Sequence, residues 1–256
     1  MGIALVTGAS AGLGVEFCRL FARDGHSLIL VARRLDKLKE FSRELCESAP
    51  TIKVWTIGID LGLPGAGEKV FGLVNKWGLT VDFLVNNAGF GSAGNFSELD
   101  LKRELQMVDL NVRTVVELTH LFLPAMLKRK SGRILNVGST AGFQPGPFMA
   151  TYYASKAFVN SFSEALHEEL IGTGVSSTGF APGATKTEFA QVAGADKLFK
   201  RAPVAAAGPM AQFGYRAMMC GRALAVPGFL NNFMLQSLRV SPRGLVRKVA
   251  GRINHS

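Results

Sequence analysis

The stretch IALVTGASAGLG, residues 3–14, decides the fold of this chain. It joins an apolar strand to glycines at positions 8, 12 and 14, and a helical pattern follows over residues 15–25 and ends at Gly25. A strand, a tight glycine turn and a helix in this order let backbone approach a pyrophosphate and aim the helix N-terminus at it. The spacing, GxxxGxG, differs from the commoner GxGxxG fingerprint, so the turn taken alone also fits a purely structural role.

The second apolar run, SLILVARR at residues 27–34, indicates which dinucleotide the turn serves. NAD sites place an acid near the end of this strand to bind the ribose 2′-hydroxyl, whereas an arginine accommodates the 2′-phosphate of NADP. Here the strand ends in Ala32, Arg33 and Arg34, and the first acid, Asp36, already belongs to the helical run 35–48. Because a guanidinium pairs with a phosphate through two hydrogen bonds, the sequence favours NADP(H), with a solvated arginine pair as the alternative.

The alternation of strands and helices continues along the chain. Further strands are predicted at residues 52–60, 81–89, 132–139 and 175–183, and helices at 65–78, 97–130 (with Ser97 or Asp100 as N-cap) and 152–170. A mixed stretch follows, then a helix at 205–219, a short strand at 222–228, and two amphipathic helices split near Ser241 and Pro242. We therefore predict an α/β fold: a single doubly wound Rossmann-type domain over residues 1–256, with a parallel sheet of about seven strands, helices on both faces and C-terminal amphipathic helices.

Length, charge and cysteine content restrict the class of protein. The chain has 256 residues, its first strand starts at Gly2 or Ile3 with no room for a targeting peptide, and no apolar run approaches a membrane span of ~18 residues. Cys18, Cys46 and Cys220 lack metal-ligand or disulfide-framework spacing, so we expect no metal site and a cytoplasmic setting. The net charge of +10 comes from residues 197–256, which hold ten basic and no acidic side chains, and this local excess does not indicate nucleic-acid binding.

A second stretch, GSTAGFQPGPFMATYYASK at residues 138–156, carries the chemistry. Ser139 ends a buried strand, at the sheet edge where open α/β folds bind ligands. Tyr152 and Lys156 are four residues apart and share one face of the predicted helix. A cation about 4 Å from the phenol favours the phenolate by roughly 4 kcal/mol at an effective dielectric of ~20, so we expect the pKa of Tyr152 to be lowered toward neutral. Tyr152 is then suited to move a proton to or from a carbonyl oxygen.

Together these residues resemble the short-chain dehydrogenase/reductase family over nearly the first 190 residues. TGASAGLG at 7–14 is similar to its cofactor turn, NNAG at 86–89 to its sheet-stabilising motif, and Asn111 in VDLNV to its catalytic asparagine. Ser139, with Tyr152 and Lys156, matches its serine and YxxxK signature, and PGATKT at 182–187 matches the stretch that closes over the nicotinamide. Six motifs in the same order make a chance resemblance implausible.

The resemblance implies a role for each matching residue. Ser139 is expected to hydrogen-bond the substrate oxygen, and Tyr152 to donate or remove the proton. Lys156 is expected to lower the Tyr152 pKa and hold the nicotinamide ribose, while Asn111 holds a water that relays the proton. The expected cofactor contacts are Thr7, Gly8, Ser10, Gly12, Leu13, Gly14, Arg33, Arg34, Asp60, Leu61, Asn87, Ala88, Gly89, Tyr152, Lys156, Pro182, Gly183, Thr185 and Thr187.

Three features depart from the pattern of many family members. Ala11 stands where many NADP-using members carry a basic residue, so Arg33 is expected to supply most of the NADP preference. Gly138 replaces a second serine before Ser139. The C-terminus lacks the VDGG-like ending of many tetrameric members, which leaves the assembly open between a homodimer and a tetramer.

The function expected from these residues is NADP-dependent hydride transfer between the nicotinamide and an apolar carbonyl or alcohol substrate. Reduction of a 3-oxoacyl thioester of coenzyme A or a carrier protein is the enzymatic alternative, and a non-catalytic NADP-binding sensor is the alternative of another class. The region after residue 187 suggests an apolar substrate pocket, although core packing explains its side chains equally well. The residues concerned are Phe189, Leu198, Phe199, Met210, Phe213, Met218 and Met219.

The basic C-terminal helices allow three explanations: a subunit contact, a lid over the substrate, or a helix lying on an anionic membrane. We expect a folded tail that borders the active site, with membrane contact at most peripheral, because such helices usually bury their apolar face on protein.

Overall fold

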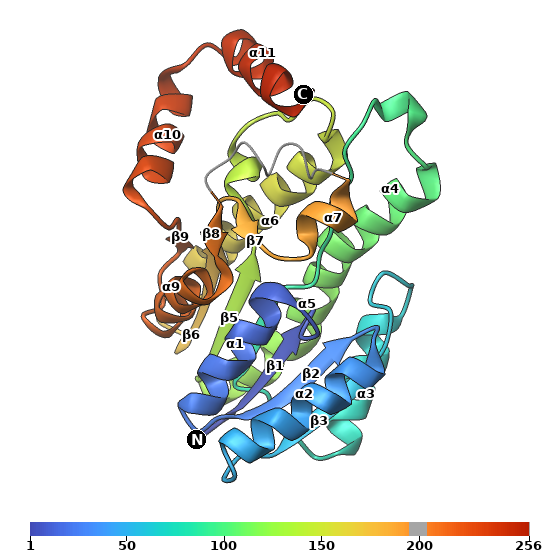
Figure 1. The fold of residues 1–256 in the computed structure, drawn as a ribbon. Coiled ribbons are helices and arrows are strands. Elements are labelled where there is room, and N and C mark those ends of the chain that lie inside the picture. Colours follow the sequence, from blue (N-terminus) through green and yellow to red (C-terminus); the bar gives the residue numbers. More distant parts are fainter. Residues whose placement is uncertain (195–203, 256) are drawn as a thin grey trace.

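Seven parallel strands form the central sheet of the computed structural model, which describes residues 1–194 and 204–255 (Figure 1). The strands are β1 (Ile3–Thr7), β2 (Ser27–Ala32), β3 (Val54–Gly58), β4 (Phe83–Asn86), β5 (Gly132–Val137), β6 (Val175–Phe180) and β9 (Leu224–Ala225). They lie in the order β3-β2-β1-β4-β5-β6-β9, so the strand order reverses direction at β1. Ligands bind outside the carboxyl ends of the strands at such a reversal. The predicted doubly wound parallel sheet is confirmed.

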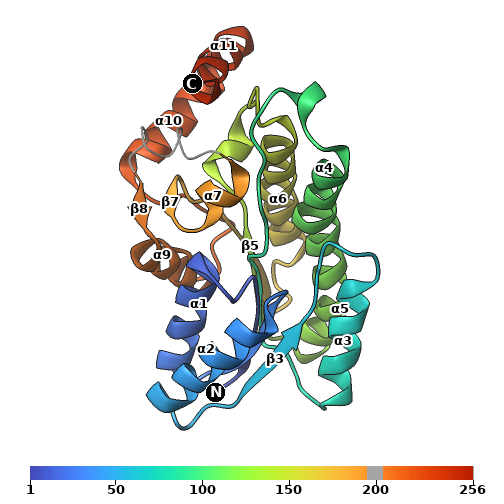
Figure 2. The same cartoon turned by 45° about the vertical axis from the view of Figure 1, so that its right-hand side comes forward.

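Helices cover both faces of the sheet because successive strand residues point to opposite sides (Figure 2). In β1, Ala4 and Val6 pack into one hydrophobic cluster, whereas Leu5 packs into the other. The first cluster is closed by α1 (Gly12–Arg23), α2 (Leu35–Ser48) and α9 (Ala207–Met219), and the second by α3 (Ala66–Lys76), α5 (Thr114–Arg129) and α6 (Ala150–Glu169). Both faces are buried, which explains why the strands are continuous apolar runs in the sequence.

The predicted helix over residues 97–130 is divided by a turn of different pitch. Asp100 is its N-cap and accepts a hydrogen bond from the Lys102 amide; α4 then spans Leu101–Val108. A π-helical turn, Asp109–Arg113, follows and leads into α5. Such single-turn bulges frequently lie at functional sites, and this one carries Asn111.

Helices α7, α10 and α11, whose bounds follow, lie beyond the carboxyl ends of the strands, on the side away from the N-terminus (Figure 1). A short ladder joins β7 (Thr185–Lys186) to β8 (Ala205–Ala206), and α7 (Phe189–Ala193) follows β7. The two amphipathic helices are α10 (Phe229–Val240) and α11 (Arg243–Asn254), divided as predicted at Ser241 and Pro242. In residues 1–194 and 204–255 no helix is both long and apolar enough to cross a membrane.

The side chains after residue 187 allow two explanations, an apolar pocket or core packing, and core packing holds for four of them. Met218 of α9 is fully buried in the cluster that α1, α2 and α9 close, and Met210, Phe213 and Met219 of the same helix pack against that cluster, so none of the four lines the cavity. Leu198 and Phe199 lie outside the described residues. Phe189 alone of the described members lines the cavity.

Candidate active site

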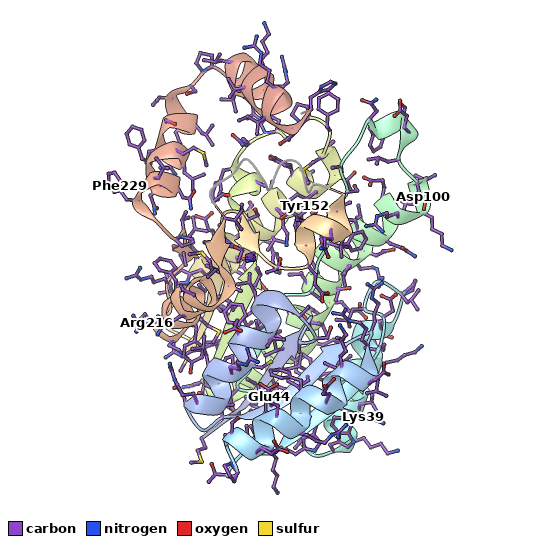
Figure 3. All side chains as sticks on the ribbon, in the orientation of Figure 1. Lys39, Glu44, Asp100, Tyr152, Arg216 and Phe229 are labelled. Carbon is purple, nitrogen blue, oxygen red and sulfur yellow. The ribbon has the colours of Figure 1, made fainter. Side chains whose placement is uncertain are left out.

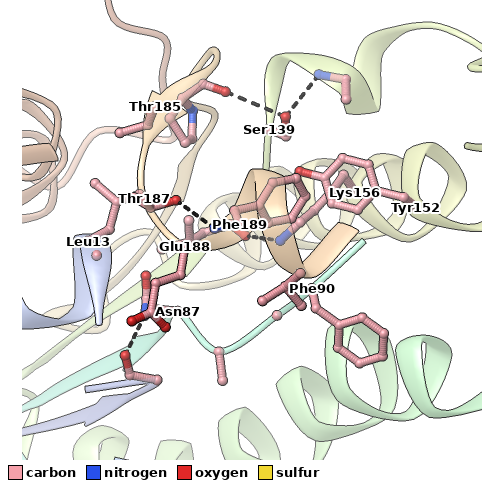
Figure 4. Close-up of a pocket in the computed structure, with 18 of the residues that line it drawn as sticks. Leu13, Asn87, Phe90, Ser139, Tyr152, Lys156, Thr185, Thr187, Glu188 and Phe189 are labelled. Atoms are coloured by element: carbon pink, nitrogen blue, oxygen red, sulfur yellow. Dashed lines mark hydrogen bonds between the residues drawn. The ribbon is translucent and has the colours of Figure 1, made fainter. Parts of the chain in front are cut away.

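A cavity of about 500 Å³ opens at the carboxyl ends of the strands, and residues from most of the predicted motifs line it (Figure 4). Three predicted residues, Thr7, Gly14 and Asn111, are not in its wall. The predicted residues that line it are Gly8, Ser10, Gly12, Leu13, Arg33, Arg34, Asp60, Leu61, Asn87, Ala88, Gly89, Ser139, Tyr152, Lys156, Pro182, Gly183, Thr185 and Thr187.

The glycine turn is shaped as a cradle. Gly8 and Gly12 have φ angles of 67° and 55°, in the left-handed region that favours glycine. A Cβ at Gly8 would lie 2.7 Å from Asn87 Nδ2, and one at Gly14 would overlap the Gly8 carbonyl. Behind the turn, Thr7 Oγ1 accepts hydrogen bonds from the Asn87 and Ala88 amides at 2.9 and 3.0 Å. Side chains are thus excluded where a pyrophosphate would approach the α1 N-terminus, so these residues fit a dinucleotide.

Two arginines lie at the adenosine end of this cradle. Arg33 is largely exposed, with Nη1 4.0 Å from Asp60 Oδ2. Arg34 donates from Nη2 to Ser10 Oγ at 3.2 Å and to Glu188 Oε2 at 3.0 Å. Two neighbouring guanidinium groups in the cavity wall are suited to bind a 2′-phosphate.

Ser139 is held at the end of β5 from two sides. Its Oγ accepts from the Ala141 amide at 3.1 Å and lies 3.5 Å from the Pro182 carbonyl, to which it donates. Asn160 Nδ2, one turn beyond Lys156 on α6, donates to the Ser139 carbonyl at 3.0 Å. Asn160 also explains Gly138, because a Cβ at that position would overlap Asn160 Oδ1. Sequence reasoning missed Asn160, although its i, i+4 spacing from Lys156 places it on the same helix face.

Tyr152 and Lys156 are both buried on α6, and they correct the expected electrostatics. Lys156 Nζ lies 6.0 Å from the Tyr152 ring centroid and donates to the Val137 carbonyl at 2.8 Å. Burial raises the pKa of Tyr152 to about 12, which a hydrogen bond with Ser139 partly offsets. Burial also lowers the pKa of Lys156 to about 8. The prediction of a lowered Tyr152 pKa is therefore wrong for this arrangement, because desolvation of the phenol is the largest effect on its pKa.

Asn111 sits behind the cavity wall and connects it to α6. Its side chain accepts from the Phe90 amide at 3.1 Å and donates to the Phe90 carbonyl at 2.9 Å. It also donates to Ser155 Oγ at 3.0 Å, and Ser155 in turn donates to the Tyr152 carbonyl at 2.7 Å. The π-helical turn thus directs Asn111 toward the backbone that carries Tyr152.

The other end of the cavity is apolar and includes the tail. Phe189 packs on Tyr152 with ring centroids 5.1 Å apart (Figure 4), and Tyr153 also lines the wall. Tyr153 OH donates to Asn254 Oδ1 at 3.3 Å, which binds α11 to α6. The described lining residues at this end are Phe90, Met149, Tyr152, Tyr153, Phe189, Val192, Met234, Ile253 and Asn254.

The tail helices bury only part of their apolar surface. Leu235 is buried with Ala181 and Val226, whereas Phe229 is 87% exposed and points away from the body of the protein (Figure 3). One side of α10 therefore forms part of the core, while another remains uncovered in the monomer.

Comparison with known proteins identifies relatives of this chain. The family model described as "short chain dehydrogenase" matches residues 2–198. Sulfoacetaldehyde reductase 2 of Chromohalobacter salexigens is 39% identical over 192 residues, which cover 74% of this chain and 75% of that enzyme. The very-long-chain 3-oxoacyl-CoA reductase of Rattus norvegicus is 34% identical over 193 residues, covering 74% of this chain and 61% of that protein.

Solved structures extend the similarity into the C-terminal part. A short-chain dehydrogenase from Sphingobium yanoikuyae in complex with NADPH has a TM-score of 0.86 at 28% identity, covering 96% of this chain and 95% of its own. The bulky-bulky ketone specific alcohol dehydrogenase from Comamonas testosteroni has a TM-score of 0.81 at 26% identity, with coverages of 96% and 93%.

Proposed function

The chain belongs to the short-chain dehydrogenase/reductase family, and on this basis we propose that it is an NADP(H)-dependent oxidoreductase that interconverts an apolar carbonyl compound and its alcohol. The observation that carries the proposal is the meeting of Ser139, Tyr152 and Lys156 in one cavity with the glycine cradle. Two neighbouring structures were solved with NADPH or NADP⁺, which supports the same cofactor here.

The cofactor's place in the cavity follows from the residues that fit it. The backbone around Gly8 and Gly12 would hold the pyrophosphate, and Arg33 and Arg34 would hold the 2′-phosphate. When bound, NADP(H) supplies or accepts the hydride. Lys156 would hold the nicotinamide ribose.

Tyr152 moves the proton in this proposal. With its pKa raised to about 12, the phenol is protonated near neutral pH and can donate to a carbonyl oxygen in the reducing direction. Ser139 would bind the same oxygen, because it lines the same cavity as Tyr152. As the phenolate forms, the Lys156 ammonium stabilises it across the ring. Asn111 positions α6 through Ser155 and would hold the water that replaces the proton.

The substrate class follows from where charge lies in the cavity. Among the described lining residues, the exposed cations Arg33 and Arg34 are at the adenosine end, whereas Phe90, Met149 and Phe189 surround Tyr152. An apolar wall favours a hydrocarbon-bearing ketone or aldehyde over a small anionic one such as sulfoacetaldehyde. Met234 places the tail at this wall, so we propose that α10 and α11 take part in substrate binding, with residues 1–256 acting as one unit.

A 3-oxoacyl thioester is the second candidate substrate. The basic residues Lys248 and Arg252 line a shallow pocket on α11 next to Phe148 and could contact coenzyme A or carrier phosphates, and a relative is a 3-oxoacyl-CoA reductase. A non-catalytic sensor is disfavoured because it does not require Asn111, Ser139, Tyr152 and Lys156 together.

The test measures the rate of NADPH oxidation with a panel of ketones, aldehydes, steroids and 3-oxoacyl thioesters. The thioesters are supplied in two forms, one with the coenzyme A phosphates and one without them. On the best substrate, Tyr152→Phe should reduce turnover by about 10²- to 10⁴-fold while NADPH binding stays near normal. Tyr153→Phe is the matched control and should retain most of the turnover. Full turnover by the Tyr152→Phe variant would refute the mechanism.

We also infer self-association in a cytoplasmic setting. Leu101, Leu105 and Val108 are exposed along one side of α4, and the exposed Phe158 of neighbouring α6 stacks on Phe162. Exposed apolar side chains of this kind suit a contact with a second copy of the chain. The cysteines are unpaired, in keeping with a reducing compartment. A monomer in sedimentation at micromolar concentration would contradict the self-association.

A further inference from the structure

Glu188, the residue before α7, forms an ion pair with Arg34 at the adenosine end of the cavity. Glu188 Oε2 accepts from Arg34 Nη2 at 3.0 Å, and Glu188 Oε1 lies 3.9 Å from Lys37 Nζ. The same Arg34 nitrogen contacts the Ser10 carbonyl at 3.3 Å and its hydroxyl at 3.2 Å. Arg34 thus joins the glycine turn and α2 to the residue that precedes α7.

The residues on either side of Glu188 lie against the other two parts of the site. Thr187 lies over the turn, since a Cβ at Gly12 would be 2.8 Å from Thr187 Cγ2. Phe189 packs on Tyr152 at 5.1 Å between ring centroids. Three consecutive residues therefore connect the glycine turn, the arginine pair and the proton-carrying tyrosine.

We propose that Glu188 competes with the 2′-phosphate of NADP(H) for Arg34, so that NADP(H) releases residues 187–189 from α2 while NAD(H) leaves them attached. The inference rests on the proposed function, because it requires a dinucleotide in this cavity. A phosphate ester carries about −1.5 to −2 charges at pH 7 and repels a carboxylate on the same guanidinium. The Arg34 and Glu188 side chains are 40% and 49% exposed, so their ion pair can be exchanged at low cost.

The competition makes Glu188 a determinant of cofactor specificity that acts against the phosphate. By linkage, the free energy that the Glu188–Arg34 ion pair contributes weakens binding of the 2′-phosphate by the same amount. The contacts of the rest of the cofactor are not affected. Among the described residues, the carboxylate that pairs with Arg33 is Asp60, with Nη1 and Oδ2 4.0 Å apart, and Arg33 forms no ion pair with Glu188.

The test uses the cofactor's adenosine half as a probe, which separates this contact from the nicotinamide end. In calorimetric titrations, Glu188→Gln should bind 2′,5′-ADP about two- to fivefold more tightly than the wild type, the range expected for exchanging an exposed ion pair, with 5′-ADP unchanged. Glu44→Gln is the matched control: it removes the same charge from an exposed pair with Arg19, outside the cavity lining, and should change neither affinity.

A second arm distinguishes competition from general repulsion. In an Arg34→Ala background, Glu188→Gln should lose its effect on 2′,5′-ADP, whereas simple charge repulsion would persist. Equal affinity of the wild type for 2′,5′-ADP and 5′-ADP would overturn the proposed NADP preference along with this inference. A wild type that prefers 2′,5′-ADP, with that preference unaltered by Glu188→Gln or altered equally in both backgrounds, would overturn the competition alone.

Discussion

Replacing Lys156 by methionine should change how the stability of the protein depends on pH. The side chain is 6% exposed, and burial lowers its pKa from 10.5 to about 8. Between these two values the unfolded chain binds one proton more than the folded protein, so the free energy of unfolding rises with pH. At about 1.4 kcal/mol per pH unit, the wild type should gain about 2–3 kcal/mol between pH 7 and 10 from this one group.

Methionine has a similar length and no charge, so Lys156→Met removes this gain. Urea unfolding of both proteins at pH 7, 8, 9 and 10 gives the difference in free energy at each pH, in which the titration of all other groups cancels. At pH 7 the variant should equal or exceed the wild type in stability, although it should be inactive. Above pH 10 the raised Tyr152 pKa acts in the opposite direction in both proteins, because the unfolded chain then releases its proton first. A wild-type-minus-variant difference that stays constant from pH 7 to 10 would show that the ammonium is not desolvated.

Two further changes test the cofactor and the tail. Arg33→Ala should reduce the preference for NADPH over NADH by about ten- to a hundredfold in direct binding, since charge-assisted contacts to a phosphate contribute ~1.5–3 kcal/mol; an unchanged preference would move the role to Arg34. Truncation after Pro227 removes Met234 and Asn254 from the cavity and exposes Ala181 and Val226, so it should weaken substrate binding and lower stability while NADPH binding persists. Unchanged stability, assembly and kinetics with only the affinity for anionic liposomes lost would instead identify a membrane helix.

Sequence patterns were sufficient for the fold because its determinants are local. The Gly8 turn, the buried strands and the division at Pro242 each follow from a few adjacent residues, and tertiary packing agrees with them. The YxxxK spacing likewise placed Tyr152 and Lys156 on one helix face.

The features that sequence reasoning missed depend on contacts between distant segments. Asn160 donates to the Ser139 carbonyl, Glu188 pairs with Arg34, and Tyr153 binds Asn254. Spacing places Asn160 on the helix face of Lys156, but in none of the three cases does the local sequence identify the distant partner. The direction of the Tyr152 pKa was wrong for a related reason. Spacing along a helix gives the proximity of a charge, whereas burial, the larger effect here, depends on the whole surrounding fold.

The close packing of Gly138 against Asn160 restricts the order in which these two positions can change. A serine or alanine at 138 overlaps the Asn160 side chain, so Asn160 must move and its hydrogen bond to the Ser139 carbonyl is disturbed. A smaller residue at position 160 makes room for a side chain at position 138, but that substitution first removes the hydrogen bond to the Ser139 carbonyl. Any mutational path from this chain to one with paired serines at 138 and 139 therefore passes through an intermediate with a loosened Ser139, and only variants with stability or activity to spare can take it.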